Sequence, residues 1–161
     1  MKIKGCLTSD NQCWSTPKNI YNHFVKKHGD FDPCPENPKF NGLEIEWKEK
    51  NFVNPPYNQI DKWIDKALRE RERGHFSILL IPARTDTKWF RKLIENNCKI
   101  YFIQGRLKFS EKKSAPFPSM FVLVDNYCNI QFRLLKKEDM EKIFKENEKW
   151  IRTKHLIISK I

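Results

Sequence analysis

The stretch FSILLIP, residues 76 to 82, constrains the fold of this chain more than any other part of the sequence. A continuous apolar run bounded by turn residues is typical of a strand that is buried on both faces of a sheet. Such a strand needs a packing layer above and below it. The run therefore predicts an α/β protein whose helices cover both faces of its sheet.

Further strand patterns alternate with helix patterns along the chain, as expected for a sheet with parallel pairs. The expected strands are a very short one at 31–32, another at 51–53, and three longer ones at 99–103, 120–124 and 129–135. Asp125 and Asn126 form a turn signal between the last two strands. We therefore predict a compact, Rossmann-like sheet that is mostly parallel and ends in an antiparallel C-terminal hairpin.

Helices are predicted where apolar residues recur every three or four positions. The first begins with Thr16 as N-cap and Pro17 as its first residue, and it ends at Gly29. The second begins after Asn58, which can cap it, and ends at Gly74. A third, short helix is expected after a cap at Thr85 or Asp86, and a last helix near the C-terminus. The residues predicted to face inward are Tyr21, Phe24, Val25 and His28 in the first helix, and Ile60, Trp63, Ile64, Ala67 and Leu68 in the second. In the third they are Trp89, Phe90, Leu93 and Ile94, and in the last Met140, Ile143, Phe144 and Ile151.

The length of 161 residues suits one domain, with a core at about 14–135 and a helical extension at 136–161. The N-terminus lacks the apolar segment of a signal peptide, and no apolar run reaches the length of a membrane helix. The five Cys are odd in number and show no C-x-x-C pair, so reduced thiols are expected and no zinc site is supported. These features favour an intracellular protein.

The net charge of +11, from 31 basic and 20 acidic residues, favours a polyanionic partner such as nucleic acid. The excess is concentrated between residues 84 and 113, where only three acidic residues occur. The basic residues of this segment are Arg84, Lys88, Arg91, Lys92, Lys99, Arg106, Lys108, Lys112 and Lys113. A Lys-rich, solvated surface is the alternative, and the mixed charges of 136–149 fit that reading.

Three unusual loops directly follow predicted strands: N-P-P-Y at 54–57, P-A-R-T-D at 82–86 and G-R-L-K-F at 105–109. The carboxyl ends of parallel strands meet at one edge of a sheet, which is where such sheets bind their ligands. The three loops therefore predict a functional site at this edge.

The N-P-P-Y stretch suits chemistry on a planar amine such as N6 of adenine, although a plain turn after a strand is the alternative. The lone pair of such an amine is delocalised, and two acceptors aimed at its hydrogens would help it become tetrahedral. Asn54 offers a side-chain oxygen, and Pro55 offers a carbonyl whose position the proline ring restricts. Tyr57 offers a flat face for stacking, worth ~1–3 kcal/mol. A target base in duplex DNA would have to be flipped out to reach them.

The sequence resembles the phage-type DNA N-6-adenine methyltransferase family (Dam family) of S-adenosylmethionine-dependent amino methyltransferases. Seven blocks in the order of that family are far more specific than N-P-P-Y alone. They are W-S-T-P at 14–17, F-D-P-C at 31–34, N-G-L at 41–43 with Trp47, V-N-P-P-Y at 53–57, I-P-A-R-T-D-T-K-W-F at 81–90, G-R-L-K-F at 105–109 and A-P-F-P-S at 115–119. The resemblance implies a methyltransferase sheet, S-adenosyl-L-methionine as cofactor, double-stranded DNA as partner, and the cytoplasm of a bacterial or phage-infected cell.

The resemblance also implies roles for individual residues, with no metal. The implied catalytic motif is Asn54, Pro55, Pro56 and Tyr57. The implied cofactor-binding residues are Trp14, Ser15, Thr16, Pro17, Asp32, Pro33, Cys34 and Asn54. The implied DNA-side residues are Arg84, Asp86, Trp89, Arg106, Lys108, Phe109, Lys112 and Lys113. As alternatives, Trp14 and Trp89 would be core, Asp32 a turn former, Arg84 to Asp86 a helix cap with a salt bridge, and 106–108 a solvated loop.

The chain departs from larger methyltransferases in several places. D-P-C-P-E-N at 32–37 stands where their Gly-rich cofactor loop would be, and the short distance from Asp32 to Asn54 predicts a trimmed sheet. Asn41 stands where many relatives carry Asp before G-L, so an acidic partner for the cofactor ribose must lie elsewhere. The candidates for that partner are Glu36, Glu44 and Glu46.

Three functions remain open at this point. The favoured one is methylation of adenine N6 in DNA. The second is methylation of another planar amine, in RNA adenine or protein glutamine, and the third is a non-catalytic nucleic-acid-binding module. The charge favours nucleic acid over protein, the resemblance favours DNA over RNA, and the intact N-P-P-Y argues against a non-catalytic module. The sequence does not indicate the recognised DNA site or the oligomeric state.

Overall fold

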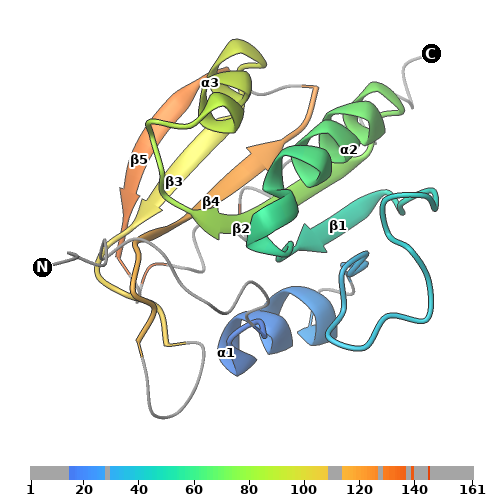
Figure 1. The fold of residues 1–161 in the computed structure, drawn as a ribbon, viewed down its shortest axis with the longest axis horizontal. Helices are drawn as coiled ribbons and strands as arrows, with labels where there is room; N and C mark the ends of the chain where they lie inside the picture. Colours follow the sequence, from blue (N-terminus) through green and yellow to red (C-terminus); the bar gives the residue numbers. More distant parts are fainter. Residues whose placement is uncertain are drawn as a thin grey trace, which may run out of the picture.

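The computed structural model describes residues 15–27, 30–108, 114–126, 129–136, 139 and 145. Within these residues a five-stranded sheet has helices on both faces (Figure 1). The elements in chain order are α1 (Lys18–Tyr21), the π-helical η1 (Asn22–Lys27), β1 (Lys50–Val53), the 3-10 turn η2 (Tyr57–Gln59), α2 (Ile60–Glu72), β2 (Phe76–Pro82), α3 (Lys88–Glu95), β3 (Lys99–Ile103), β4 (Ser119–Val124) and β5 (Gln131–Leu135). The last predicted helix, at 140–151, lies outside the described residues apart from Lys145.

The strand order is β1-β2-β4-β3-β5. β1 pairs in parallel with β2 and β3 with β5, whereas β4 is antiparallel to its neighbours β2 and β3. Four of the five strands therefore point the same way, which confirms the predicted α/β class and mostly parallel sheet. The very short strand expected at 31–32 contributes only a parallel bridge from Phe31 to Asn51, so it extends the sheet minimally beside β1.

The predicted C-terminal hairpin is wrong, because β3 lies between β4 and β5. β5 pairs with β3 in parallel, and β4 forms its antiparallel pair with the preceding strand instead of the following one. Burial explains the order. β4 is buried along its whole length and occupies the middle of the sheet, whereas β5 exposes Phe132 and Leu134 and occupies an edge. The turn signal at 125–126 marks a chain reversal but does not determine which strand the returning chain joins.

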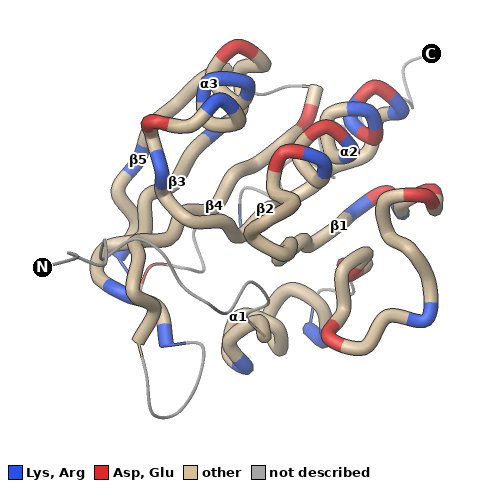
Figure 2. The backbone as a smooth tube through the Cα atoms, viewed as in Figure 1, with Lys and Arg blue, Asp and Glu red and all other residues tan. Residues whose placement is uncertain are grey.

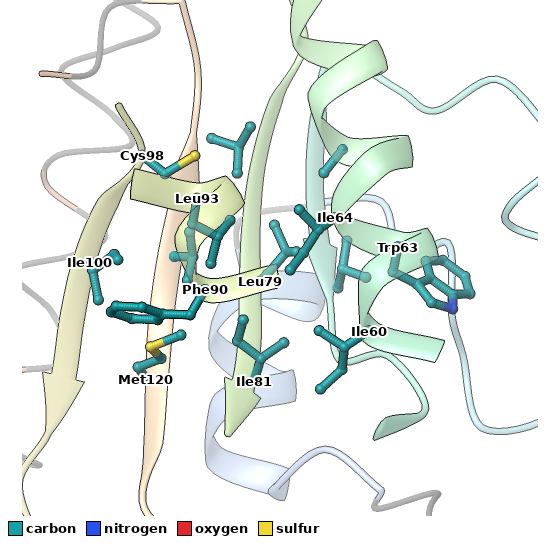
Figure 3. Packing of buried hydrophobic residues seen from close by; sticks show 14 of the residues in the cluster. Ile60, Trp63, Ile64, Leu79, Ile81, Phe90, Leu93, Cys98, Ile100 and Met120 are labelled. Atoms are coloured by element: carbon teal, nitrogen blue, oxygen red, sulfur yellow. The ribbon is translucent and has the colours of Figure 1, made fainter. Parts of the chain in front are cut away.

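β2 is buried along its whole length, as its apolar run predicts. Its side chains alternate between two cores, as the period of a strand requires. Ile78 and Leu80 face the core that contains Phe24 of η1. Leu79 and Ile81 face the core under α2 and α3 (Figure 3). Each face of this strand is therefore covered by helical segments, and the prediction of helices on both faces is confirmed.

The segment formed by α1 and η1 is held to the sheet by an aromatic pair. The Phe24 ring stacks on the Phe52 ring of β1, with 4.6 Å between the centroids and 15° between the planes. Ile20 is also buried, whereas Tyr21 is only half-buried. The buried positions of this segment are therefore Ile20 and Phe24, with Val25 partly buried beside them, while the predicted His28 lies outside the described residues.

Three predicted helix caps are displaced. Pro17 lies at the N-cap of α1, so Thr16 does not cap this helix. Asn58 lies inside η2, and α2 begins only at Ile60. In α3 the cap is Thr87, whose Oγ1 accepts a hydrogen bond of 3.2 Å from the backbone N of Phe90. The buried positions of α2 and α3 agree with their predicted apolar faces, and these faces determine where each helix lies on the sheet.

Sequence reasoning gave no indication of the buried carboxylate of Glu70 near the end of α2. Its oxygens lie 2.6 Å from Lys66 Nζ, 3.0 Å from Arg73 Nη1 and 2.9 Å from His75 Nδ1. Burial acts to raise the pKa of Glu70, but the hydrogen bonds of Lys66 and His75 and the nearby positive charges outweigh it and lower that pKa. The paired carboxylate fixes the end of α2 against the start of β2.

Gly42 has no space for a side chain. A Cβ at this position would lie 1.9 Å from the carbonyl oxygen of Pro33 and 2.8 Å from the Trp63 ring. The Gly42 carbonyl in turn accepts a hydrogen bond of 2.7 Å from Trp47 Nε1. The N-G-L block and Trp47 therefore hold the loop that begins at Pro33 against α2.

We expect Gly42→Ala to lower the free energy of unfolding by ~1–3 kcal/mol or more, because the nearest clash is with backbone, which cannot move without shifting the loop. Chemical denaturation measures the loss. The control is Glu44→Ala, at an exposed position two residues away, which is expected to stay within about 0.5 kcal/mol of the wild type. Equal stability of the two variants would contradict the close approach of Pro33.

Candidate functional site

The three loops predicted to share one edge of the sheet do so. β1, β2 and β3 run in the same direction, so N-P-P-Y, P-A-R-T-D and G-R-L-K-F all follow carboxyl ends at this edge (Figure 1). β4 is antiparallel and therefore begins here, which adds the A-P-F-P-S block. The backbone N of Ala83 donates to the Pro118 carbonyl at 2.9 Å, and the Tyr57 and Phe117 rings meet edge-on at 5.1 Å.

A cavity of about 680 Å³ opens beside N-P-P-Y. Its size lies within the range of about 300–1,000 Å³ that is usual for small-molecule sites. Its lining comes from three segments, namely the chain around α1 (Ser15, Thr16, Lys18, Tyr21, Asn22 and Lys26), the loop after Phe31 (Asp32, Cys34, Pro35, Glu36 and Pro38), and Asn54, Pro55 and Pro56 at the end of β1.

Most of the predicted cofactor-binding residues line this cavity together: Ser15, Thr16, Asp32, Cys34 and Asn54. Pro17 and Pro33 do not line it; both are buried, Pro17 at the N-cap of α1 and Pro33 with its carbonyl close to Gly42. Trp14 lies outside the described residues. The fold thus brings together segments that are far apart in the sequence, which the family blocks indicated and local patterns did not.

Asn54 is almost fully buried, with 9% of its surface exposed. Its Nδ2 donates a hydrogen bond of 3.1 Å to Oγ1 of Thr16. This contact orients the amide, with its nitrogen toward Thr16 and its oxygen on the other side of the group. Pro55 and Pro56 lie beside Asn54 in the cavity lining, where β1 has ended because proline cannot continue the strand ladder.

Tyr57 does not line the cavity. It begins η2, is half-buried, and packs against both cores of the sheet as well as against Phe117. Burial raises the pKa of the Tyr57 hydroxyl. A stacking role for this ring toward a base stays a prediction, and its edge-on contact with Phe117 fixes the plane that the ring would offer.

Asp32 places a carboxylate in the cavity wall. Its Oδ1 accepts a hydrogen bond of 2.9 Å from the backbone N of Cys34, so it also forms the turn that was the alternative reading. Burial raises the pKa of Asp32 to about 6, while the hydrogen bond from Cys34 acts in the opposite direction. The group is therefore ionised at neutral pH and becomes protonated in mildly acidic solution.

Glu36 is the one of the three acidic candidates for a ribose partner that lines the cavity. Its Oε1 accepts a hydrogen bond of 2.7 Å from Ser15 Oγ. Glu44 and Glu46 are exposed elsewhere. Asn41 has a turn-forming role, since its Oδ1 accepts from the backbone N of Leu43 at 3.1 Å.

Four lining residues on the first helical segment escaped sequence reasoning: Lys18, Tyr21, Asn22 and Lys26. The signal that could have found them is their spacing, which places them on the face of the segment away from the buried Ile20 and Phe24. Two of the four are basic, so this segment adds positive charge to a lining that also contains Asp32 and Glu36.

The predicted DNA-side residues that the structure describes lie at the same edge but do not line the cavity. Arg84 is half-buried, and its carbonyl accepts from Thr87 Oγ1 at 2.9 Å, as expected for a residue that precedes a helix. Trp89 is half-buried against Phe90, so it is partly core. The other described members of this set, Asp86, Arg106 and Lys108, are exposed. Phe109, Lys112 and Lys113 lie outside the described residues. Figure 2 marks where charged residues occur along the backbone.

The family description of DNA N-6-adenine-methyltransferase (Dam) matches residues 5–143 of the sequence. The chain belongs to this family. The DNA N-6-adenine-methyltransferase of Escherichia phage T1 is 30% identical over 122 residues, which are 66% of this chain and 51% of the phage T1 protein. The chain therefore spans about half the length of this relative.

A solved structure, that of a predicted O-methyltransferase from Agrobacterium tumefaciens, matches 60% of this chain and 48% of its own at 16% identity. The TM-score of this match is 0.39. Within the described ranges, no helix is both long and apolar enough to cross a membrane. In the same part of the chain, no group of three or more His, Cys, Asp or Glu side chains is placed to hold a metal ion.

We expect Asp32→Asn to stabilise the protein at neutral pH by about 1–2 kcal/mol. The pKa of Asp32 is higher in the folded protein than in the unfolded chain, so the folded state binds more protons between about pH 4 and 6. The wild type therefore loses stability as the pH rises through this range, and the neutral amide does not. Urea unfolding from pH 4 to pH 8 measures the difference, which should vanish near pH 4.

The control for this comparison is Asp86→Asn, at an exposed position. Its free energy of unfolding at pH 8 should stay within about 0.5 kcal/mol of the wild type, as expected for an exposed position. Equal stabilities of Asp32→Asn and the wild type at pH 8 would show that burial does not disfavour the charged form of Asp32.

Proposed function

We propose that the protein transfers a methyl group from S-adenosylmethionine to the N6 amine of adenine in DNA. The observation that carries the proposal is the position of N-P-P-Y. Asn54 and the two prolines form one wall of a cavity whose other walls are the chain around α1 and the loop from Asp32 to Pro38. In the proposal residues 14–135 form the methyltransferase core, and 136–161 extend it.

The residues in the cavity fit the cofactor. Ionised Asp32 supplies a negative charge suited to the cationic sulfonium or ammonium group, and the Glu36 carboxylate suits the two hydroxyls of a ribose. Lys18 and Lys26 suit a carboxylate group, and Pro35 offers an apolar surface. The cavity thus combines charges of both signs with apolar surface, which matches a zwitterionic cofactor that also carries a base. When bound there, S-adenosylmethionine supplies an electrophilic methyl group.

In the proposed reaction Asn54 Oδ1 and the Pro55 carbonyl accept hydrogen bonds from the target amine. These bonds help its nitrogen become tetrahedral, so that the lone pair becomes available. The nitrogen forms a bond with the methyl carbon as the bond from that carbon to sulfur breaks, and the methylated nitrogen then loses a proton to solvent. A preorganised pair of acceptors is sufficient, so no strong base is needed.

The basic excess predicted between residues 84 and 113 is partly neutralised within the protein. Lys92 lies 2.7 Å from both Asp61 and Asp65, and Arg91 lies 2.7 Å from Glu95. Lys99 stands at the start of β3, at the opposite edge of the sheet. Arg84, Lys88, Arg106 and Lys108 are the described basic residues of this segment that follow the carboxyl ends of β2 and β3, at the functional edge. We propose that they contact DNA phosphates around a flipped adenine.

We expect Asn54→Ala to lower the rate of methyl transfer by 10²-fold or more, because one acceptor for the target amine is removed. The measurement is mass spectrometry of nucleosides after incubation with cofactor and DNA, with RNA in parallel. The matched control is Asn58→Ala, an exposed Asn four residues later, which should keep wild-type activity.

N6-methyladenine formed by the wild type in DNA alone supports the proposed substrate. A signal only in RNA would indicate that RNA is the substrate. No signal in either polymer would favour a protein amide as the substrate. Wild-type activity in Asn54→Ala would show that Asn54 is not the acceptor.

We expect the double variant Arg106→Ala with Lys108→Ala to bind all DNA sequences more weakly, because phosphate contacts carry no sequence information. Fluorescence anisotropy at several salt concentrations measures this, and the slope of log K against log salt should fall by about 2. The control is Arg69→Ala with Lys99→Ala, which removes the same charge from the opposite edge of the sheet. Equal slopes for both double variants would contradict a DNA contact through the loop after β3.

A further inference from the structure

We propose that Thr16 is a positioning residue that holds the side-chain amide of Asn54 in the orientation needed for methyl transfer. The inference rests on the proposed function, in which Asn54 accepts a hydrogen bond from the target amine. It assigns to Thr16 a role toward a catalytic side chain, in addition to its place in the lining of the cavity. The contact between the two residues joins positions 16 and 54 across the edge of the sheet.

An asparagine amide can occupy two orientations that differ by a half-turn and that exchange its oxygen and nitrogen. Only one of them points oxygen at an amino group, because the other would set one N–H donor against another. In the structure Asn54 Nδ2 donates to Thr16 Oγ1 at 3.1 Å. Loss of this acceptor would remove a contact that favours the productive orientation.

The threonine hydroxyl has one proton and two lone pairs, so the direction of its own proton matters. If that proton pointed at Asn54, it would favour the flipped amide. Thr16 also lines the cavity, where a bound ligand with an acceptor oxygen can take the proton. The lone pairs of Oγ1 are then left for Asn54 Nδ2. Occupancy of the cavity therefore favours the productive orientation of Asn54 through Thr16.

Both partners of this hydrogen bond are held by the same part of the sheet. Thr16 is followed by buried Pro17 and by the helical segment that contains Phe24. The Phe24 ring stacks on Phe52, which precedes Asn54 by two residues in the chain. The stacked pair therefore holds the helical segment that follows Thr16 against the strand that precedes Asn54.

The test compares Thr16→Val, which keeps the shape and loses the hydroxyl, with Thr16→Ser, which keeps the hydroxyl. We expect Thr16→Val to lower kcat on the order of tenfold, the effect of losing one hydrogen bond of ordinary net strength. The KM for DNA should change little, and Thr16→Ser should restore kcat to within about twofold. If Thr16→Val does not fold, Thr16→Ala removes the hydroxyl without adding bulk and takes its place.

A second measurement needs no catalysis. The side-chain amide signals of Asn54 in a ¹H–¹⁵N spectrum are identified by their loss in Asn54→Ala. They should shift in Thr16→Val and stay near their wild-type position in Thr16→Ser. Ser15→Ala serves as the comparison, because the Ser15 hydroxyl donates to Glu36; it should leave the Asn54 signals in place.

The outcomes separate this inference from the proposed function. A wild type that methylates no substrate contradicts the proposed function, while the spectra still test the contact between Thr16 and Asn54. Wild-type kcat in Thr16→Val overturns the inference if the wild type is active. A lower kcat with unchanged Asn54 signals also overturns it, because Thr16 would then act by another route.

Discussion

The burial of β2 on both faces is the constraint on which the rest of this structure depends. Seven consecutive residues of this strand are buried, so each face of the sheet must be covered by other parts of the chain. α2 and α3 cover one face, and the segment from Lys18 to Lys27 covers the other. That second layer is short, and the stacking of Phe24 on Phe52 fixes it to β1. When this segment packs on the sheet, it therefore also places the part of the cavity lining that it contributes.

Because one segment both covers the sheet and lines the cavity, a cavity can form although the Gly-rich loop of larger methyltransferases is missing. The loop after Phe31 is positioned by the close approach of Pro33 to Gly42 and by the hydrogen bond from Trp47 to that glycine. Its prolines and its hydrogen-bonded Asp32 give the loop a defined shape without glycine flexibility. The cavity can therefore bring polar groups from three separate segments to the end of β1, beside the residues proposed to bind the target amine.

The features that one local pattern determines were predicted correctly from the sequence. The features for which a local pattern allows several arrangements were not. The apolar run of β2, the helix face around Trp63 and the polar loops at one edge were all predicted. The strand with which β5 pairs was not predicted correctly. A turn signal shows where the chain reverses, but it does not determine which strand the returning chain joins. The predicted caps were displaced by one or two residues, and only α3 has a cap of the expected type, Thr87, whereas Pro17 and Gln59 stand at the N-cap positions of α1 and α2. Thr16 left the cap position, and its hydroxyl contacts Asn54.

The sequence by itself determined the fold class, the edge of the sheet that carries the polar loops, and the family blocks, because these depend on patterns within short stretches. The tertiary structure alone decided which residues meet. It placed Glu36 in the cavity and left Glu44 and Glu46 outside, inserted β4 between β2 and β3, and gave Asn54 its partner. The physical reason is that such contacts join residues distant in the chain, and packing of both faces of the sheet, rather than any local preference, sets the distances between them.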